Sequence, residues 1–127
     1  MARRTMIDAA DLPHHTNPIP VAVKLGNLVF SSALMGQDPD THEVPDDPAR
    51  QVELVFRAVR RVMEEAGGSI DNIGKMSVYL QDMQLRPLVN EHWLAMFPNE
   101  HDRPVRHTQQ SDLNGNMVIQ IEITGMV

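Results

Sequence analysis

The sequence has no cysteine, few aromatic residues and no long apolar run. Its 127 residues include one Trp, one Tyr and three Phe. Without cysteine there can be no disulfide, no thiolate metal ligand and no cysteine nucleophile, and the chain suits the reducing cytoplasm. The scarcity of aromatic rings argues against a stacking surface for single-stranded nucleic acid. Because no apolar run approaches the roughly 18–20 residues of a membrane span, we expect a cytoplasmic protein without a membrane partner.

Basic charge is also scarce. Lys and Arg number 11 against 17 Asp and Glu, which gives a net charge of -6. The arginines are scattered, and Arg57, Arg60 and Arg61 share one predicted helix with glutamates. Since phosphate neutralisation by a basic surface supplies most of the affinity for nucleic acids, we expect no nucleic-acid partner.

The six histidines do not form a metal-binding motif. His14 and His15 are adjacent, so their side chains diverge on an extended chain, and no pair has the His-x-His or His-x-x-x-His spacing of a zinc site. We therefore predict neither a metal ion nor a cofactor. His14 or His15 can still lie near a binding cleft and influence its specificity.

What the sequence does contain is a regular succession of strand and helix patterns. Residues 1–20 are interrupted by prolines and are predicted to be irregular. Beyond them, alternating apolar residues predict strands, whereas apolar residues spaced three and four apart predict helices. Pro48 and Gly67 mark the ends of the first helix, and Pro98 ends the second. The predicted order is a hairpin of strands at 21–25 and 28–32, a helix at 48–66, a strand at 75–80, a helix at 84–97, and strands at 103–108 and 119–124.

This order predicts one domain, residues 1–127, with an α+β fold. Two amphipathic helices can cover only one face of a mixed β-sheet, which gives a two-layer sandwich. The other face is predicted to carry mostly short, uncharged polar side chains, which suits packing against copies of the same chain. The predicted polar residues of this face are Ser77, Tyr79, Gln120, Glu122 and Thr124.

The last two predicted strands carry the most informative charges. In residues 119–124 isoleucine alternates with polar residues, so Glu122 projects from the polar face. We expect residues 103–108, which contribute Arg106, to form the neighbouring strand, with His107 facing away from Arg106. An arginine and a glutamate on a rigid sheet can hold a small carboxylate ligand and a water molecule. A strand arginine beside a glutamate is more often a structural or interface ion pair than a catalytic couple, so the pattern leaves both interpretations open.

A series of short stretches, none specific by itself, matches a known family in order and spacing. The stretches are residues 22–32, 38–41, Gln51, 66–69, 75–82, 89–90, 103–106 and 119–122. Together they resemble the Rid family (reactive intermediate deaminases, also called YjgF proteins), which acts on imines and enamines. The resemblance implies a chorismate-mutase-like fold, a homotrimer and active sites in the clefts between subunits.

The resemblance also implies roles for individual residues. Arg106 looks like the arginine that binds the substrate carboxylate, and Glu122 looks like the carboxylate associated with the hydrolytic water. Asn90 looks like the family's helix asparagine near the site, and Ser32 like the serine on the second strand of the hairpin.

Three features depart from the family's best-studied branch. Ile19 stands where that branch has a tyrosine, and Thr108 replaces a cysteine two residues after the arginine. The pair Arg86-Pro87 before Asn90 does not match the family pattern closely. The missing phenol leaves the usual substrate, 2-aminoacrylate, an open question.

The residues and the resemblance together predict a deaminase that hydrolyses small carboxylate-bearing imines or enamines to 2-oxo acids and ammonia. Arg106 would bind the carboxylate, Glu122 would assist the water, and Thr108 would add a hydrogen bond. Two alternatives stay open. One is an aminomuconate-type deaminase of an aromatic catabolic pathway, which acts on a longer acid. The other is a non-catalytic trimeric binder of small 2-oxo acids.

Overall fold

The computed structural model describes residues 3–127. Within this range the strands are β1 (Arg4–Ile7), β2 (Ala22–Leu25), β3 (Leu28–Ser31), β4 (Leu34–Met35), β5 (Ile73–Leu80), β6 (Val105–Gln110) and β7 (Ile119–Met126). The helices are α1 (Pro48–Glu65) and α2 (Arg86–Met96), and the short 3-10 turns η1 (Ile70–Asn72) and η2 (Met83–Leu85) precede β5 and α2. None of the described helices is long and apolar enough to cross a membrane.

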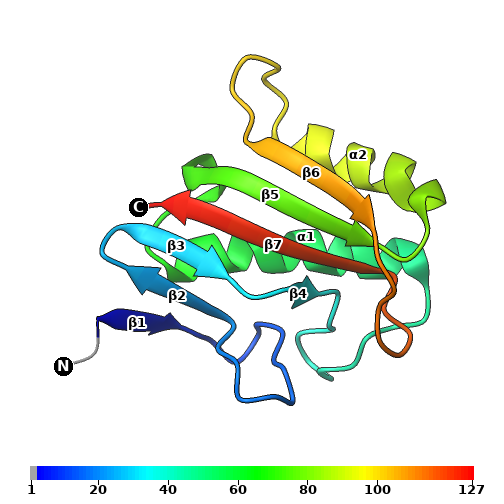
Figure 1. The fold of residues 1–127 in the computed structure, drawn as a ribbon, viewed down its shortest axis with the longest axis horizontal. Helices are drawn as coiled ribbons and strands as arrows, with labels where there is room; N and C mark the ends of the chain where they lie inside the picture. Colours follow the sequence, from blue (N-terminus) through cyan, green and yellow to red (C-terminus); the bar gives the residue numbers. More distant parts are fainter. Residues whose placement is uncertain (1–2) are drawn as a thin grey trace.

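The molecule has two layers, a mixed sheet and a pair of helices. The strand order is β1-β2-β3-β7-β5-β6, and β4 pairs with β7 beyond the end of β3. Both helices lie on the same side of the sheet, and no helix covers the other side (Figure 1). The predicted two-layer α+β fold is therefore confirmed. We call the uncovered side the open face of the sheet.

The first helix follows its sequence signals closely. The side chain of Asp47 accepts a hydrogen bond from the Ala49 N–H at 3.2 Å, and Pro48 occupies the first helical position. After the helix the chain reverses at Gly67, which has a positive φ of 93°. The apolar stripe is fully buried against the sheet and includes Val52, Val55, Val59 and Val62.

Several boundaries differ from the sequence predictions. Residues 1–20 were predicted to be irregular, but Arg4–Ile7 forms β1, which pairs antiparallel with β2; residues 1 and 2 lie outside the described range. β4 is only two residues long, too short for an alternating pattern to reveal it. The second helix begins at Arg86 and not at Gln84, because Asp82 caps the separate turn η2 through the Gln84 N–H.

The largest correction concerns the last two strands. β6 was predicted to neighbour β7, but β5 lies between them. β5 and β6 are parallel and are joined through α2, whereas β7 pairs antiparallel with the other edge of β5. The connection from β6 to β7 therefore passes over the end of β5, where the Ser111 N–H donates to the Leu80 carbonyl at 3.0 Å.

Gln51, one of the residues shared with the Rid family, has a structural role. Its side chain is fully buried, and its amide nitrogen donates to the carbonyls of Pro45 and Asn116 at 2.7 and 2.8 Å. Its amide oxygen accepts from the Val118 N–H at 2.9 Å. These bonds fasten α1 to the loop before it and to the turn before β7. Gly36 packs on the same residue, because a Cβ there would lie 2.3 Å from the Gln51 carbonyl oxygen.

Candidate functional site

Arg106 lies on β6, an edge strand of the sheet. In the strand register it is paired with Met76, which is itself paired with Ile123. Residues paired across strands point to the same face, and both Met76 and Ile123 are buried beneath the helices. The side chain of Arg106 therefore lies on the helix-covered side of the sheet, beside α2.

Two side chains of α2 hold the guanidinium of Arg106. Nη2 donates a hydrogen bond to Oδ1 of Asn90 at 2.8 Å, and the guanidinium carbon lies 5.0 Å from the ring centroid of Trp93. The Trp93 ring in turn packs edge-on against Phe97, with centroids 4.9 Å apart. Val89, four residues before Trp93 on α2, is fully buried and packs in the core. The arginine is thus held by a neutral amide and an aromatic face.

This cation has no counter-ion in the described part of the chain. Among residues 3–127, no carboxylate oxygen lies within 4.0 Å of Arg106. Partial burial lowers the pKa of Arg106, and the charge of nearby Arg86 lowers it further. A partly buried, oriented guanidinium without a counter-ion can accept an anionic ligand. The interpretation of Arg106 as part of a structural ion pair with Glu122 is therefore wrong for one chain.

Thr108 lies two residues further along β6 and faces the same side as Arg106. Its hydroxyl oxygen is buried and makes no hydrogen bond with any described residue. Buried polar atoms are nearly always paired, so the unpaired hydroxyl of Thr108 is an exception among the described residues. Arg106, Thr108 and Asn90, three of the predicted site residues, are thus assembled around the β6 edge.

Glu122 lies on the other face of the sheet. In the register it pairs with Ser77, which also pairs with His107, so these three side chains point to the open face. Its carboxylate is close to Tyr79, whose pKa is raised by burial and then by the charge of Glu122. Arg106 and Glu122 of one chain are therefore not brought together as the sequence had predicted. The register of β6 and β7 with the intervening strand β5 places the two side chains on opposite faces of the sheet.

Ile19 and Ser32 lie near β2, toward the opposite edge of the sheet from β6. Ser32 donates its hydroxyl proton to the Pro20 carbonyl at 2.5 Å, so it satisfies a backbone group and ties the N-terminal segment to the hairpin. Ile19 is half exposed and lines a shallow cavity of about 270 Å³ together with His14 and His15.

His14 contacts an acidic side chain and a second histidine. Its Nε2 lies 2.7 Å from the Asp8 carboxylate, and its ring centroid lies 5.6 Å from that of His42. Within residues 3–127, no three His, Cys, Asp or Glu side chains gather closely enough to hold a metal ion.

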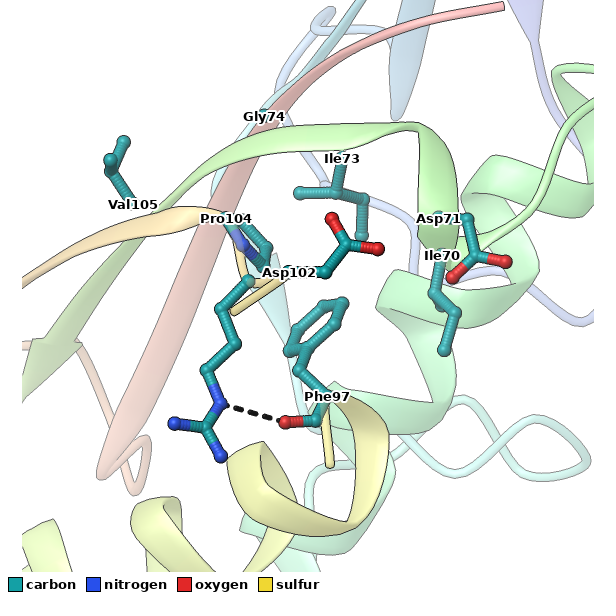
Figure 2. Close-up of a pocket in the computed structure, with 9 residues that line it drawn as sticks. Ile70, Asp71, Ile73, Gly74, Phe97, Asp102, Pro104 and Val105 are labelled. Carbon is teal, nitrogen blue, oxygen red and sulfur yellow. Dashed lines mark hydrogen bonds between the residues drawn. The ribbon is translucent and has the colours of Figure 1, made fainter. Parts of the chain in front are cut away.

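A separate cavity of about 160 Å³ lies where β6 begins (Figure 2). Its charged side chains are Asp71, Asp102 and Arg103, and the Nε of Arg103 donates to the Phe97 carbonyl at 2.8 Å. Two carboxylates on the wall disfavour an anionic ligand. This cavity therefore does not suit the predicted carboxylate substrate.

Sequence reasoning missed the contribution of Trp93 to the site. The spacing of Asn90 and Trp93 on one side of a helix is a signal that both approach the same neighbour. Sequence alone did not show that this neighbour is Arg106.

Comparison with known proteins identifies the family of this chain. Residues 9–127 match the family described as endoribonuclease L-PSP. A RutC family protein of Pyrococcus abyssi is 30% identical over 112 residues, which cover 87% of each chain. TdcF of Escherichia coli K12, assigned to the reactive intermediate deaminases, is 31% identical over 98 residues, covering 77% of this chain and 75% of TdcF.

Solved structures show the same fold. The crystal structure of RidA from the Antarctic bacterium Psychrobacter has a TM-score of 0.89 and 30% identity, and the match covers 97% of this chain and 99% of that one. Escherichia coli TdcF, crystallised with bound serine, has a TM-score of 0.87 and 28% identity, with 97% and 98% of the two chains covered. The chain belongs to the endoribonuclease L-PSP family, which includes the Rid (YjgF) proteins.

Proposed function

We propose that this protein is a deaminase that hydrolyses small carboxylate-bearing imines and enamines. The observation that carries the proposal is the oriented guanidinium of Arg106, which lacks a carboxylate partner within residues 3–127 and lies beside the unpaired hydroxyl of Thr108. The substrate carboxylate supplies the missing negative charge, and two parallel charge-assisted hydrogen bonds fix its plane. The bound serine of the related TdcF structure is also a small carboxylate.

Hydrolysis of an imine requires few contributions from the protein. Water adds its oxygen to the imine carbon, the carbon–nitrogen bond breaks, and the nitrogen leaves as ammonia with the protons taken from water. The product is a 2-oxo acid. Holding the carboxylate and a water molecule in the correct orientation lowers the entropic part of the barrier, and a carboxylate near the water assists proton transfer. We propose Glu122 for the second task, with the Tyr79 phenol beside it as a hydrogen-bond donor.

We further propose that each site lies between two subunits of a trimer. Arg106, Asn90 and Thr108 come from one subunit, and Glu122 and the surroundings of Ile19 and Ser32 come from the next. Two observations support this arrangement. Arg106 and Glu122 lie on opposite faces of one chain. The open face also carries exposed large apolar side chains, as interfaces between copies do, namely Leu28, Phe30, Val105 and Met126.

A specific observation keeps the longer substrate of an aminomuconate-type deaminase as a second candidate. Ile19 lines an open cavity with no phenol on it, so the segment that would approach the substrate leaves room. The family description mentions ribonuclease activity, but the net charge of -6 favours a small-molecule substrate over RNA.

The test is a coupled assay in which an amino-acid oxidase generates imines from a panel of amino acids. We expect the protein to accelerate 2-oxo acid formation and the Arg106→Ala variant to lose this acceleration. Glu122→Gln should lose turnover and still bind a 2-oxo acid. If the parent binds 2-oxo acids but accelerates no imine hydrolysis, the protein is a non-catalytic binder and the proposed function is wrong.

Mixing two inactive variants tests the shared site. When Arg106→Ala and Glu122→Gln subunits are unfolded, mixed equally and reassembled, some sites receive an intact Arg106 from one subunit and an intact Glu122 from the next. For random assembly of a cyclic trimer we expect recovery of about one quarter of the parent activity. If both residues act within one chain, no mixed site is complete and activity stays absent.

A further inference from the structure

One side of α2 faces the edge strand β6 over consecutive helical turns. Arg86, Asn90 and Trp93 are spaced four and three residues apart, so they lie along the same side of the helix. Asn90 and Trp93 both contact Arg106, at 2.8 Å and 5.0 Å. Arg86 comes one turn before Asn90, and its charge is close enough to Arg106 to lower the pKa of that guanidinium.

This arrangement places two like charges near each other without compensation. Among residues 3–127, neither Arg86 nor Arg106 has a carboxylate oxygen within 4.0 Å. By contrast, Arg50, Arg57 and Arg61 on α1 each pair with acidic side chains. An anion that binds between or beside two cations relieves the repulsion between them.

We infer that the preferred substrates carry a second carboxylate at the far end of the side chain, which Arg86 binds while Arg106 binds the carboxylate next to the imine. This inference rests on the proposed function and names its substrate class, the imines and enamines of dicarboxylic amino acids. A monocarboxylate neutralises one of the two guanidinium groups, whereas a dicarboxylate neutralises both. One turn of α2, about 5.4 Å along the helix axis, is comparable to the separation of the carboxylates in an extended five-carbon diacid.

Glutamate and norvaline form a matched pair for the test, because both have five carbons and only glutamate has the second carboxylate. Each imine is generated by an oxidase that accepts the amino acid, and 2-oxo acid formation is followed with and without the protein. We expect kcat/KM for the glutamate imine to exceed that for the norvaline imine by tenfold or more, since a charge-assisted hydrogen bond contributes about 1.5–3 kcal/mol.

Two variants assign the preference to its residue. Arg86→Gln should lower kcat/KM for the glutamate imine on the order of tenfold and change that for the norvaline imine by less than about twofold. Arg60→Gln removes the same charge from an exposed position of α1 and should leave both values at the parent level. Calorimetric titration with 2-oxoglutarate and with 2-oxopentanoate gives the same comparison for binding, independently of turnover.

The outcomes separate the two proposals. If the norvaline imine is hydrolysed as well as the glutamate imine, and Arg86→Gln leaves their ratio unchanged, the dicarboxylate inference is wrong while the deaminase function stands. If neither imine is accelerated but 2-oxoglutarate binds more tightly than 2-oxopentanoate in a manner that depends on Arg86, the catalytic function is wrong and the dicarboxylate site stands. Failure of both probes to bind would overturn the inference as well.

Discussion

Arg61 on α1 and Arg106 on β6 are both partly buried arginines, but their surroundings are opposite. The Nε of Arg61 lies 2.8 Å from the Asp11 carboxylate, and its two terminal nitrogens lie 3.1 and 2.7 Å from Glu64 and Glu65. These carboxylates raise the pKa of Arg61. Arg106 instead contacts a neutral amide and an indole ring, and burial lowers its pKa.

The difference shows how a structural arginine can be told from a binding arginine. Asp11 joins Arg57 and Arg61, so the first cluster fastens the N-terminal segment to α1 and its charges are satisfied within the chain. Arg106, held by Asn90 and Trp93, is equally well positioned but has no carboxylate partner among residues 3–127. We propose that a counter-charge from outside the chain completes it.

The largest effect is expected at Arg106. Arg106→Ala should lower kcat/KM for imine hydrolysis about a hundredfold or more, because two charge-assisted hydrogen bonds to the substrate are lost. Thermal unfolding should show an unchanged or higher Tm, since an uncompensated cation is removed. Arg106→Lys keeps the charge without the fork geometry and should be intermediate. A variant at Arg61 that lost as much activity per folded molecule would contradict the contrast.

Asn90→Asp gives Arg106 a carboxylate partner, as Asp11 is for Arg61. A carboxylate at the position of the Asn90 oxygen, 2.8 Å from the guanidinium, would pair with Arg106 and compete with the substrate. We expect activity to fall by about tenfold or more while Tm rises or stays level. Asn90→Ala serves as the control, because it removes the hydrogen bond without adding charge. Full activity of Asn90→Asp would argue against carboxylate binding at Arg106.

Asp11→Asn should affect stability and leave activity intact. The cluster is partly exposed, so we expect a loss of about 1 kcal/mol, or about 3–5 °C in Tm. The Arg61 and Arg57 guanidinium groups lower the pKa of Asp11 in the folded state. Its contribution is therefore complete above the unfolded pKa of about 4 and is lost as the pH falls through the folded value. The Tm difference between parent and variant should shrink in acid; a constant difference would refute the ionic explanation.

The smallest effect is expected at Trp93. Trp93→Leu keeps an apolar side chain of α2 but removes the aromatic face under Arg106, and we expect a two- to fivefold fall in kcat/KM. Trp93→Phe retains a ring and should lose less. Steady-state kinetics on one imine substrate measures the effect of both variants. Equal activity of the parent and Trp93→Leu would show that the indole does not contribute to the site.

Sequence patterns predicted which residues form each strand and helix better than they predicted which strands lie side by side. Asp47, Pro48 and Gly67 determine the ends of α1 locally, so these were correct. β1 was missed because Arg4–Ile7 is largely exposed and lacks a strong apolar alternation. Alternation correctly predicted that His107 and Arg106 face opposite ways, because that depends on one strand only. The relative faces of Arg106 and Glu122 depend on the register across β5, a long-range property that neither strand encodes by itself.

The most direct test is a calorimetric titration of pyruvate, a minimal 2-oxo acid, into the parent, Asp11→Asn and Arg106→Ala proteins under identical conditions. We predict saturable binding with similar affinity for the parent and Asp11→Asn, and no measurable binding for Arg106→Ala. Equal pyruvate binding by Arg106→Ala and the parent would contradict the assignment of Arg106 as the carboxylate anchor.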